Sequence, residues 1–226
     1  MTLLDTWFSN PALQKALPPA IWETLIMVSI SSLATVLIGL PLGVILFITD
    51  KGGLGENRPL NVVLSSIVVN ITRSIPYAIL MLALIPFTRW IVGTSLGPMA
   101  ATVSLSIAAI PFFARLVETA LRDVHSGKLD AAHAMGSTKW QSVTKVLIPE
   151  AMPGIVAGIT TTVVTIIGYS AMAGLIGGGG LGRLAYNYGF QRFSLDIMVI
   201  TVIIIVVIVQ LVQALGDWIS RRVDHR

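Results

Sequence analysis

The residues of this chain best suited to metal binding or proton transfer are three histidines, at positions 125, 133 and 225. His125 and His133 are eight residues apart, with Gly127 between them. Zinc sites need three or four such ligands. The absence of cysteine also excludes thiolate metal sites and cysteine nucleophiles. We therefore predict no metal site, and no Ser-His-Asp arrangement is indicated.

Glycine-rich stretches offer a second possible chemistry, the binding of phosphate. The run Gly177–Gly182 is similar to a phosphate-binding loop only in its glycine content, because it lacks the lysine that would contact the phosphates. The segment Gly136–Lys139 has the wrong spacing for the same motif. The chain is therefore predicted to bind no cofactor itself, and any ATP and Mg²⁺ belong on a separate subunit.

Arg73 is the third feature, a charge within the apolar-flanked segment Asn70–Pro76 (NITRSIP). A charge at membrane depth is costly, so it is expected to face protein or water. The carbonyl groups that Pro76 frees, near Thr72, and the inner end of another span are the expected acceptors. Two interpretations stay open: Arg73 forms part of an inner gate, or it is an anchor that reaches the interface.

Composition places these residues in a membrane protein. Of 226 residues, 54% are hydrophobic and 12% are charged, against roughly 25% charged in soluble domains. The net charge of +4 does not indicate a nucleic-acid partner, because the basic residues flank apolar segments. Asp5 precedes any lysine or arginine, so we expect no cleaved signal peptide. The fold class predicted is all-α and polytopic, in a lipid bilayer.

Five apolar segments are long enough to span a bilayer. They lie at about 21–48, within 60–91, and at about 96–121, 154–173 and 195–215. Residues 1–19 are predicted to be a periplasmic or interfacial segment that ends at Pro18-Pro19, with Trp7 and Phe8 at the interface. The transmembrane domain covers 20–217, and 218–226 form a cytoplasmic tail. Gly39, Pro41 and Gly43 predict a kink in the first span.

The distribution of basic residues predicts the orientation. Five spans place the termini on opposite sides, and the positive-inside bias assigns the richer side to the cytoplasm. The inside set is Lys51, Arg58, Arg122, Lys128, Lys139, Lys145, Arg221, Arg222 and Arg226. The outside set is Lys15, Arg89, Arg183 and Arg192. The N-terminus is therefore expected to be periplasmic.

The polar segment 122–150 interrupts the spans and is predicted to fold as two short helices. Leu129, Ala132 and Met135 have helical spacing, and Gly136 is a natural helix stop. Thr138 with Gln141 forms a capping box for the second helix. The expected apolar face of that helix consists of Trp140, Val143 and Leu147. Pro149 is expected to end the helix, because the residue before a proline avoids helical geometry.

This segment resembles the signature loop of ABC-importer permeases, which is Glu-Ala-Ala, a Gly four residues on, and a later Ile-x-Leu-Pro. Here the matching residues are Asp130-Ala131-Ala132, Gly136 and Val146-x-Ile148-Pro149, so Asp130 replaces the usual Glu. In that family the loop docks into a cleft of a cytoplasmic ATPase. The resemblance implies that the coupling residues are Asp130, Ala131, Ala132, Gly136, Trp140 and Pro149.

Three further strings resemble the permease of the bacterial methionine importer over about 20–222: residues 70–76, 85–96 and 168–188. The resemblance implies a homodimer, two ATPase subunits, a periplasmic or lipoprotein methionine-binding protein, and the inner membrane. Candidate path or gate residues are Arg73, Ser74, Pro76, Tyr169, Ser170 and Met172, although Met172 also suits core packing. Small residues predict a dimer contact at Gly154, Gly158 and Thr162.

Two rival functions are open besides methionine import. A permease of the same class for another amino acid would share the coupling loop. An ion-coupled secondary transporter would need an ionisable site near the midplane and often shows paired repeats with broken helices. Five spans with no visible repeat, together with the folded segment 122–150, speak against it. An intramembrane enzyme lacks any acid–base or metal set here, so the chain is predicted to be a transport subunit.

Overall fold

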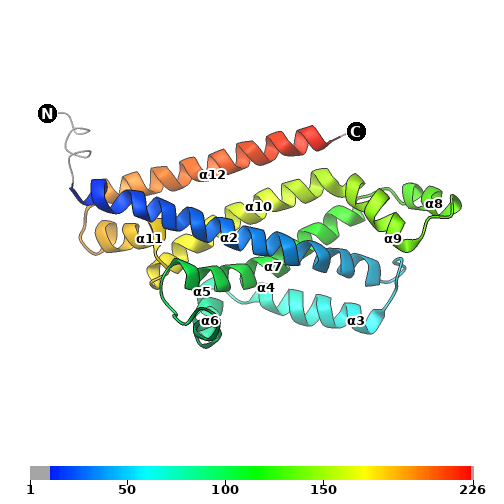
Figure 1. The fold of residues 1–226 in the computed structure, drawn as a ribbon, viewed down its shortest axis with the longest axis horizontal. Coiled ribbons are helices and arrows are strands. Elements are labelled where there is room, and N and C mark those ends of the chain that lie inside the picture. Colours follow the sequence, from blue (N-terminus) through cyan, green and yellow to red (C-terminus); the bar gives the residue numbers. More distant parts are fainter. Residues whose placement is uncertain (1–10, 225–226) are drawn as a thin grey trace. The chain divides into compact units, whose positions relative to one another are not determined.

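The computed structural model describes residues 11–224, and within them every regular element is a helix (Figure 1). The elements are α2 (Pro11–Thr49), α3 (Arg58–Val62), η1 (Val63–Ile71), α4 (Thr72–Ser74), α5 (Tyr77–Ala83), α6 (Ile85–Val92), α7 (Pro98–Arg122), α8 (Ser126–Ala134), α9 (Lys139–Gln141), η2 (Ser142–Leu147), α10 (Ile148–Leu175), α11 (Gly180–Leu184), η3 (Ala185–Phe190) and α12 (Leu195–Val223). The three η elements are π-helical turns.

Within residues 11–224, four helices are long and apolar enough to cross a membrane, and a fifth span results if one broken pair counts as a span. The broken pair is the continuous stretch Arg58–Ser74 followed by α5. Ile75 between them is extended, with φ −85° and ψ 124°, because a residue before proline avoids helical geometry. Pro76 therefore interrupts the second span, as predicted.

The first span differs from the prediction in two ways. The α2 helix begins by Pro11 and runs through Pro18-Pro19, so these prolines do not stop the segment as predicted. The periplasmic or interfacial placement of residues 1–19 stays a prediction. Leu13 and Ala20 pack with Leu181, Leu184 and Ile197, and this burial compensates for the hydrogen bonds that prolines cannot donate. The rest of the segment predicted as residues 1–19, with Trp7 and Phe8, lies outside the described residues.

The glycines of α2 serve close packing, and the helix is unbroken at the predicted kink. A Cβ atom on Gly39 would lie 2.9 Å from a ring carbon of Phe113, and one on Gly43 would lie 2.6 Å from Cβ of Val117. Both neighbours belong to α7. Small residues at these positions therefore let α2 approach α7 closely.

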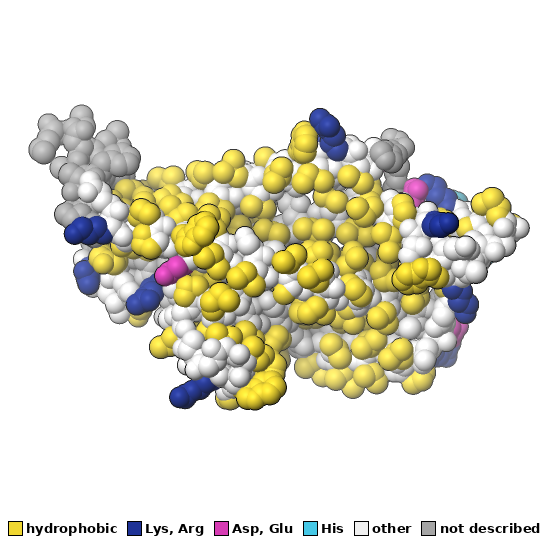
Figure 2. Space-filling view, in the orientation of Figure 1, with side chains coloured by type: hydrophobic (Ala, Val, Ile, Leu, Met, Phe, Trp, Pro, Cys, Tyr) yellow, Lys and Arg dark blue, Asp and Glu magenta, His cyan; other side chains and the backbone are white. Residues whose placement is uncertain are grey.

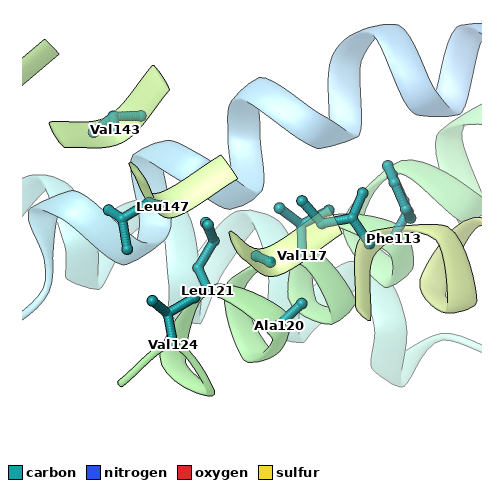
Figure 3. Packing of buried hydrophobic residues seen from close by; sticks show 9 residues of the cluster. Phe113, Val117, Ala120, Leu121, Val124, Val143 and Leu147 are labelled. Carbon is teal, nitrogen blue, oxygen red and sulfur yellow. The ribbon is translucent and has the colours of Figure 1, made fainter. Parts of the chain in front are cut away.

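The chain divides into two compact units, and long helices contribute to both. The second unit comprises Ala34–Ile75, Ala108–Thr162 and Gln213–Arg226. Its core joins α7 to η2 and α10 through Phe113, Val117, Leu121, Val143 and Leu147, which are nearly or fully buried (Figure 3). This core holds the segment 122–150 against the ends of α7 and α10.

Helical structure continues from α9 through Pro149 into α10, so the prediction that Pro149 ends a helix is wrong. The η2 turns precede the proline, and the backbone N–H of Ile148 donates to the carbonyl of Val143, five residues earlier. A π-helical stretch widens the helix and rearranges its ladder, and such bulges are a recognised way to accommodate an interruption. The burial of Leu147 then fixes this arrangement.

The first unit comprises the described residues of Met1–Leu33, together with Pro76–Ile107 and Val163–Val212. Within it, α12 is little covered by the rest of the chain: Val202, Val206 and Leu211 are at least half exposed. Figure 2 shows hydrophobic side chains over most of the visible helical surface, with charged side chains gathered near α8 and α9. The exposed apolar face of α12 is consistent with the lipid contact expected of the last span.

Candidate coupling loop and translocation-path residues

The first helix of the segment 122–150 ends in a Schellman motif centred on Gly136. The backbone N–H of Ser137 donates to the carbonyl of Ala132 at 3.1 Å, and that of Gly136 donates to the carbonyl of His133 at 2.9 Å. Gly136 has φ +78°, which favours glycine, and a Cβ there would meet nothing within 4 Å. The glycine is therefore required for backbone conformation and not for space.

The second helix begins at the predicted capping box. The backbone N–H of Thr138 donates to Oε1 of Gln141 at 2.9 Å, and the N–H of Gln141 donates to Oγ1 of Thr138 at 3.3 Å. The hydroxyls of Ser137 and Ser142 are 2.9 Å apart, and Lys128 forms an ion pair with Glu150. These contacts tie α8, the turn and the start of α10 into one folded body, shown beside the ends of α7 and α10 in Figure 1.

The exposed side of this body carries most of the predicted coupling residues. Asp130, Ala131, Gly136 and Pro149 are exposed or partly exposed, whereas Ala132 is buried at 3% exposure. Trp140 is 75% exposed, so its predicted place on a buried face with Val143 and Leu147 is wrong. The helical period changes at η2, which begins two residues after Trp140. Val143 and Leu147 therefore point toward α7, and Trp140 does not. Met135 is likewise 82% exposed.

A network of charged side chains centred on α7 lies next to the segment 122–150. Glu118 is buried, and its two carboxylate oxygens form separate ion pairs. Oε2 lies 2.6 Å from Nη1 of Arg115, and Oε1 lies 2.6 Å from Nη2 of Arg122. Arg122 also contacts Asp50 at 2.6 Å, and Arg115 donates to Oδ1 of Asn70 at 3.1 Å. Arg115 and Glu118, three residues apart on α7, therefore form an ion pair that is part of a larger network. The pKa of Asp50 lies below its ordinary value, chiefly because its carboxylate accepts a hydrogen bond from the backbone N–H of Lys51. The hydrogen bond and positive charge of Arg122 lower this pKa further.

The surroundings of Arg73 differ from those predicted. Its guanidinium lies 5.8 Å from the ring centroid of Phe112, a cation–π contact, and within residues 11–224 it forms no ion pair. The carbonyl of Thr72 accepts from the backbone N–H of Ile75, and the hydroxyl of Ser74 donates to the carbonyl of Asn70. The expected acceptors are thus used by the local backbone, and the guanidinium is exposed.

The predicted path residues of α10 lie near Tyr77, which sequence reasoning missed. The rings of Tyr169 and Tyr77 stack with centroids 4.5 Å apart and an interplanar angle of 3°. The hydroxyl of Tyr77 lies 3.2 Å from that of Ser104. Ser170 is buried and donates to the carbonyl of Ile167, and Met172 is 40% exposed. Tyr77 directly follows Pro76, a predicted path residue, and this position in the sequence could have marked it as a candidate.

The residues predicted to contact a second copy lie against α7 of the same chain. A Cβ on Gly154 would lie 2.9 Å from Cβ of Ala120, and one on Gly158 would lie 3.3 Å from Cβ of Leu116. Thr162 is buried and donates to the carbonyl of Gly158. These small residues therefore serve packing between α10 and α7, and the homodimer stays a prediction.

Glu23 is a second site residue that sequence reasoning missed. It is the one acidic residue of α2, and its carboxylate Oε2 accepts from the backbone N–H of Gly180 at 2.7 Å. The adjacent Thr24 accepts from the N–H of Leu181 at 2.8 Å. An acidic residue within an apolar span is itself a functional signal. Its partners are 157 residues away, so no local pattern reveals them.

A family model described as "Binding-protein-dependent transport system inner membrane component" matches residues 53–225. The chain belongs to this family. Among relatives, the probable D-methionine transport system permease protein MetI of Vibrio cholerae is 53% identical over 207 residues, covering 92% of each chain. The methionine import system permease protein MetP of Bacillus subtilis is 46% identical over 182 residues, covering 80% of this chain and 82% of its own.

A solved structure supports the same assignment of this inner membrane component. A chain from inward-facing conformations of the MetNI methionine ABC transporter has a TM-score of 0.93 and 46% identity, covering 96% of this chain and 100% of its own. A chain from an amino acid ABC transporter crystallised with histidines, at 21% identity and a TM-score of 0.77, shares the fold. The protein is therefore a multi-pass, all-α permease of an ABC importer, a transport component of the inner membrane as predicted.

Proposed function

We propose that this permease imports methionine, as the L form, the D form or both. The observation that carries the proposal is 53% identity over 92% of the chain to a probable D-methionine permease. A periplasmic or lipoprotein binding protein delivers the amino acid, and two separate ATPase subunits, which hold ATP and Mg²⁺, drive alternating access. The coupling loop faces the cytoplasm, with the N-terminus periplasmic and the C-terminus cytoplasmic, in keeping with the positive-inside bias.

The test is to purify the chain with its ATPase and binding protein and to identify the amino acid that the binding protein retains. Uptake of labelled methionine into proteoliposomes, dependent on ATP and on the binding protein, is the expected result. Retention and uptake of a different amino acid would support the other permease of this class and contradict methionine. Uptake that follows a proton or sodium gradient in the absence of ATP would contradict an ABC importer.

The coupling loop is proposed to transmit closure of the ATPase subunits to the spans. It exposes two large apolar side chains, Met135 and Trp140, and the carboxylate of Asp130. Large exposed apolar side chains on a rigid body are the features that anchor a protein interface. The Schellman turn and the capping box hold them in one geometry, so that a displacement of the docked loop reaches α7 and α10 through the shared core.

The second copy is proposed to contact the exposed side of α10, beside the predicted Gly154. Ala157 and Thr161 are open to the surface one and two turns along from it, whereas Gly158 faces α7 and Thr162 is buried. Because the chain has no cysteine, single substitutions give an unambiguous crosslink. We expect Ala157→Cys and Thr161→Cys to form disulfide-linked dimers in membranes, and Val206→Cys on α12 to form none. Crosslinking confined to the α12 position would contradict this contact.

Arg73 is proposed to act at an inner gate, and substitution separates this role from that of an anchor. Lysine keeps the charge but loses the planar guanidinium that stacks on Phe112. An anchor tolerates Arg73→Lys with normal uptake. A gate shows altered uptake in both Arg73→Lys and Phe112→Leu, with unchanged assembly and basal ATP hydrolysis. Normal transport by Arg73→Lys and Arg73→Gln would rule out the gate.

A further inference from the structure

The first unit contains a cavity of about 240 Å³ that the coupling and path residues do not use. It lies between α2 and the α11–η3 segment, and its wall includes Ala16, Glu23, Arg183, Asn187 and Tyr188. Figure 2 shows acidic and basic side chains on the surface in the part of the view occupied by α2 and α11. Glu23 lies within the first span, and an acidic side chain there marks a ligand or ion site more often than a lipid contact.

The carboxylate in this wall is fixed by the backbone of the glycine run. Glu23 Oε2 accepts from the N–H of Gly180, and a Cβ on Gly179 would lie 2.7 Å from that oxygen. A Cβ on Gly180 would lie 2.5 Å from Oγ1 of Thr24. The glycines therefore let the backbone reach α2, and they hold the acidic group in one position at the cavity.

A basic side chain, Arg183, lies in the same wall but does not pair with the Glu23 carboxylate. Arg183 forms no ion pair with Glu23 or with any other carboxylate of the described chain. Asn187, four residues further and hence on the same side of the helical turn, adds an amide to the wall. Opposite charges that share a cavity but do not meet are suited to a ligand that carries both.

We propose that this cavity binds the ammonium and carboxylate groups of a free amino acid. Glu23 receives the ammonium, and Arg183 with Asn187 binds the carboxylate, because a guanidinium matches the fork of a carboxylate. The volume is below the roughly 300–1,000 Å³ of drug-sized ligand sites and suits a small metabolite. Arg183 and Asn187 also line a neighbouring cavity of about 450 Å³ with Leu96, Leu175 and Tyr186, which offers room for an apolar side chain.

This inference rests on the proposed function and adds to it a binding step within the permease. The test measures equilibrium binding of labelled L-methionine to the purified permease–ATPase complex without the binding protein. Removing one charged hydrogen-bond partner is expected to weaken binding about tenfold or more, so Glu23→Gln and Arg183→Gln should both do so. In Glu23→Gln the new side-chain amide still offers an oxygen to the N–H of Gly180, so the fold is kept. Arg89→Gln is the matched control, because Arg89 is exposed on α6 and lines neither cavity.

Ligand analogues test the assignment of each charge. Methionine methyl ester lacks the carboxylate and should bind the wild type and Arg183→Gln equally weakly. The 2-hydroxy analogue lacks the ammonium, so it should bind the wild type and Glu23→Gln equally weakly. Unchanged binding in both variants, or no amino acid bound by the wild-type complex, would overturn the site.

The outcomes also separate this site from the proposed function. Methionine uptake that proceeds equally in wild type and both variants overturns the site and leaves the function standing. Uptake of another amino acid in place of methionine overturns methionine as substrate. The binding assay is then repeated with that amino acid, where dependence on both charges supports the site and independence overturns it. Basal ATP hydrolysis of each variant complex verifies its assembly.

Discussion

Gly136→Val is expected to abolish coupled import while leaving the permease assembled in the membrane. Gly136 has φ +78°, which a β-branched residue adopts only with strain. Relief of that strain breaks the two Schellman hydrogen bonds that join α8 to the turn before α9. Met135 and Trp140 then no longer hold one docking geometry. We expect uptake in proteoliposomes to fall at least about tenfold, the change that a loss of about 1.4 kcal/mol of docking free energy gives.

Two control variants isolate the cause. Gly52 has φ +77° and open space around it, in the loop after α2, so Gly52→Val introduces the same strain outside the coupling loop. It should transport normally. Gly136→Asn should retain most of the activity, because asparagine tolerates the left-handed region. Normal stimulation of ATP hydrolysis and normal uptake by Gly136→Val would refute the coupling role, and equal loss in Gly52→Val would assign the effect to general strain.

The parts of the coupling loop that were predictable from sequence are those with local causes. The capping box of Thr138 and Gln141 and the stop at Gly136 each depend on residues a few positions apart. The exposure of Trp140 and the passage of the helix through Pro149 were not predictable in this way. Both follow from the π-helical turns of η2, which tertiary packing of Val143 and Leu147 stabilises. A helical wheel assumes 3.6 residues per turn and fails where that period changes.

Long-range contacts account for the remaining differences. Residues 11–19 are helical because Leu13 and Ala20 pack on residues more than 150 positions away. The hydrogen bond from Gly180 to Glu23 has the same character, and composition alone could only suggest that the glycine run packs closely. The broken second span needed only apolar length and one proline, and it was predicted.

The second large effect is expected from Glu118→Gln. The carboxylate side chain is 3% exposed, and its two oxygens receive Arg115 and Arg122, whose side chains are 30% and 49% exposed. Glutamine removes the charge and turns an amide donor toward guanidinium donors. Breaking a buried ion pair costs about 3–5 kcal/mol, and the partly exposed arginines place this case near about 3 kcal/mol. For a chain of this size that corresponds to a fall of about 6–12 °C in Tm of the purified permease.

Asp50→Asn is the matched control for this network, because it removes the outer partner of the same arginine. The Asp50 side chain is 32% exposed, and ion pairs open to solvent contribute less than about 1 kcal/mol. Its Tm should therefore stay within about 4 °C of the wild type. In a double-mutant cycle, Glu118→Gln combined with Arg122→Gln should destabilise the permease by less than the sum of the two single changes, because both remove the same Glu118–Arg122 contact. Equal Tm values for Glu118→Gln and Asp50→Asn would contradict the view that burial of Glu118, and not the number of ion pairs, determines the strength of the network.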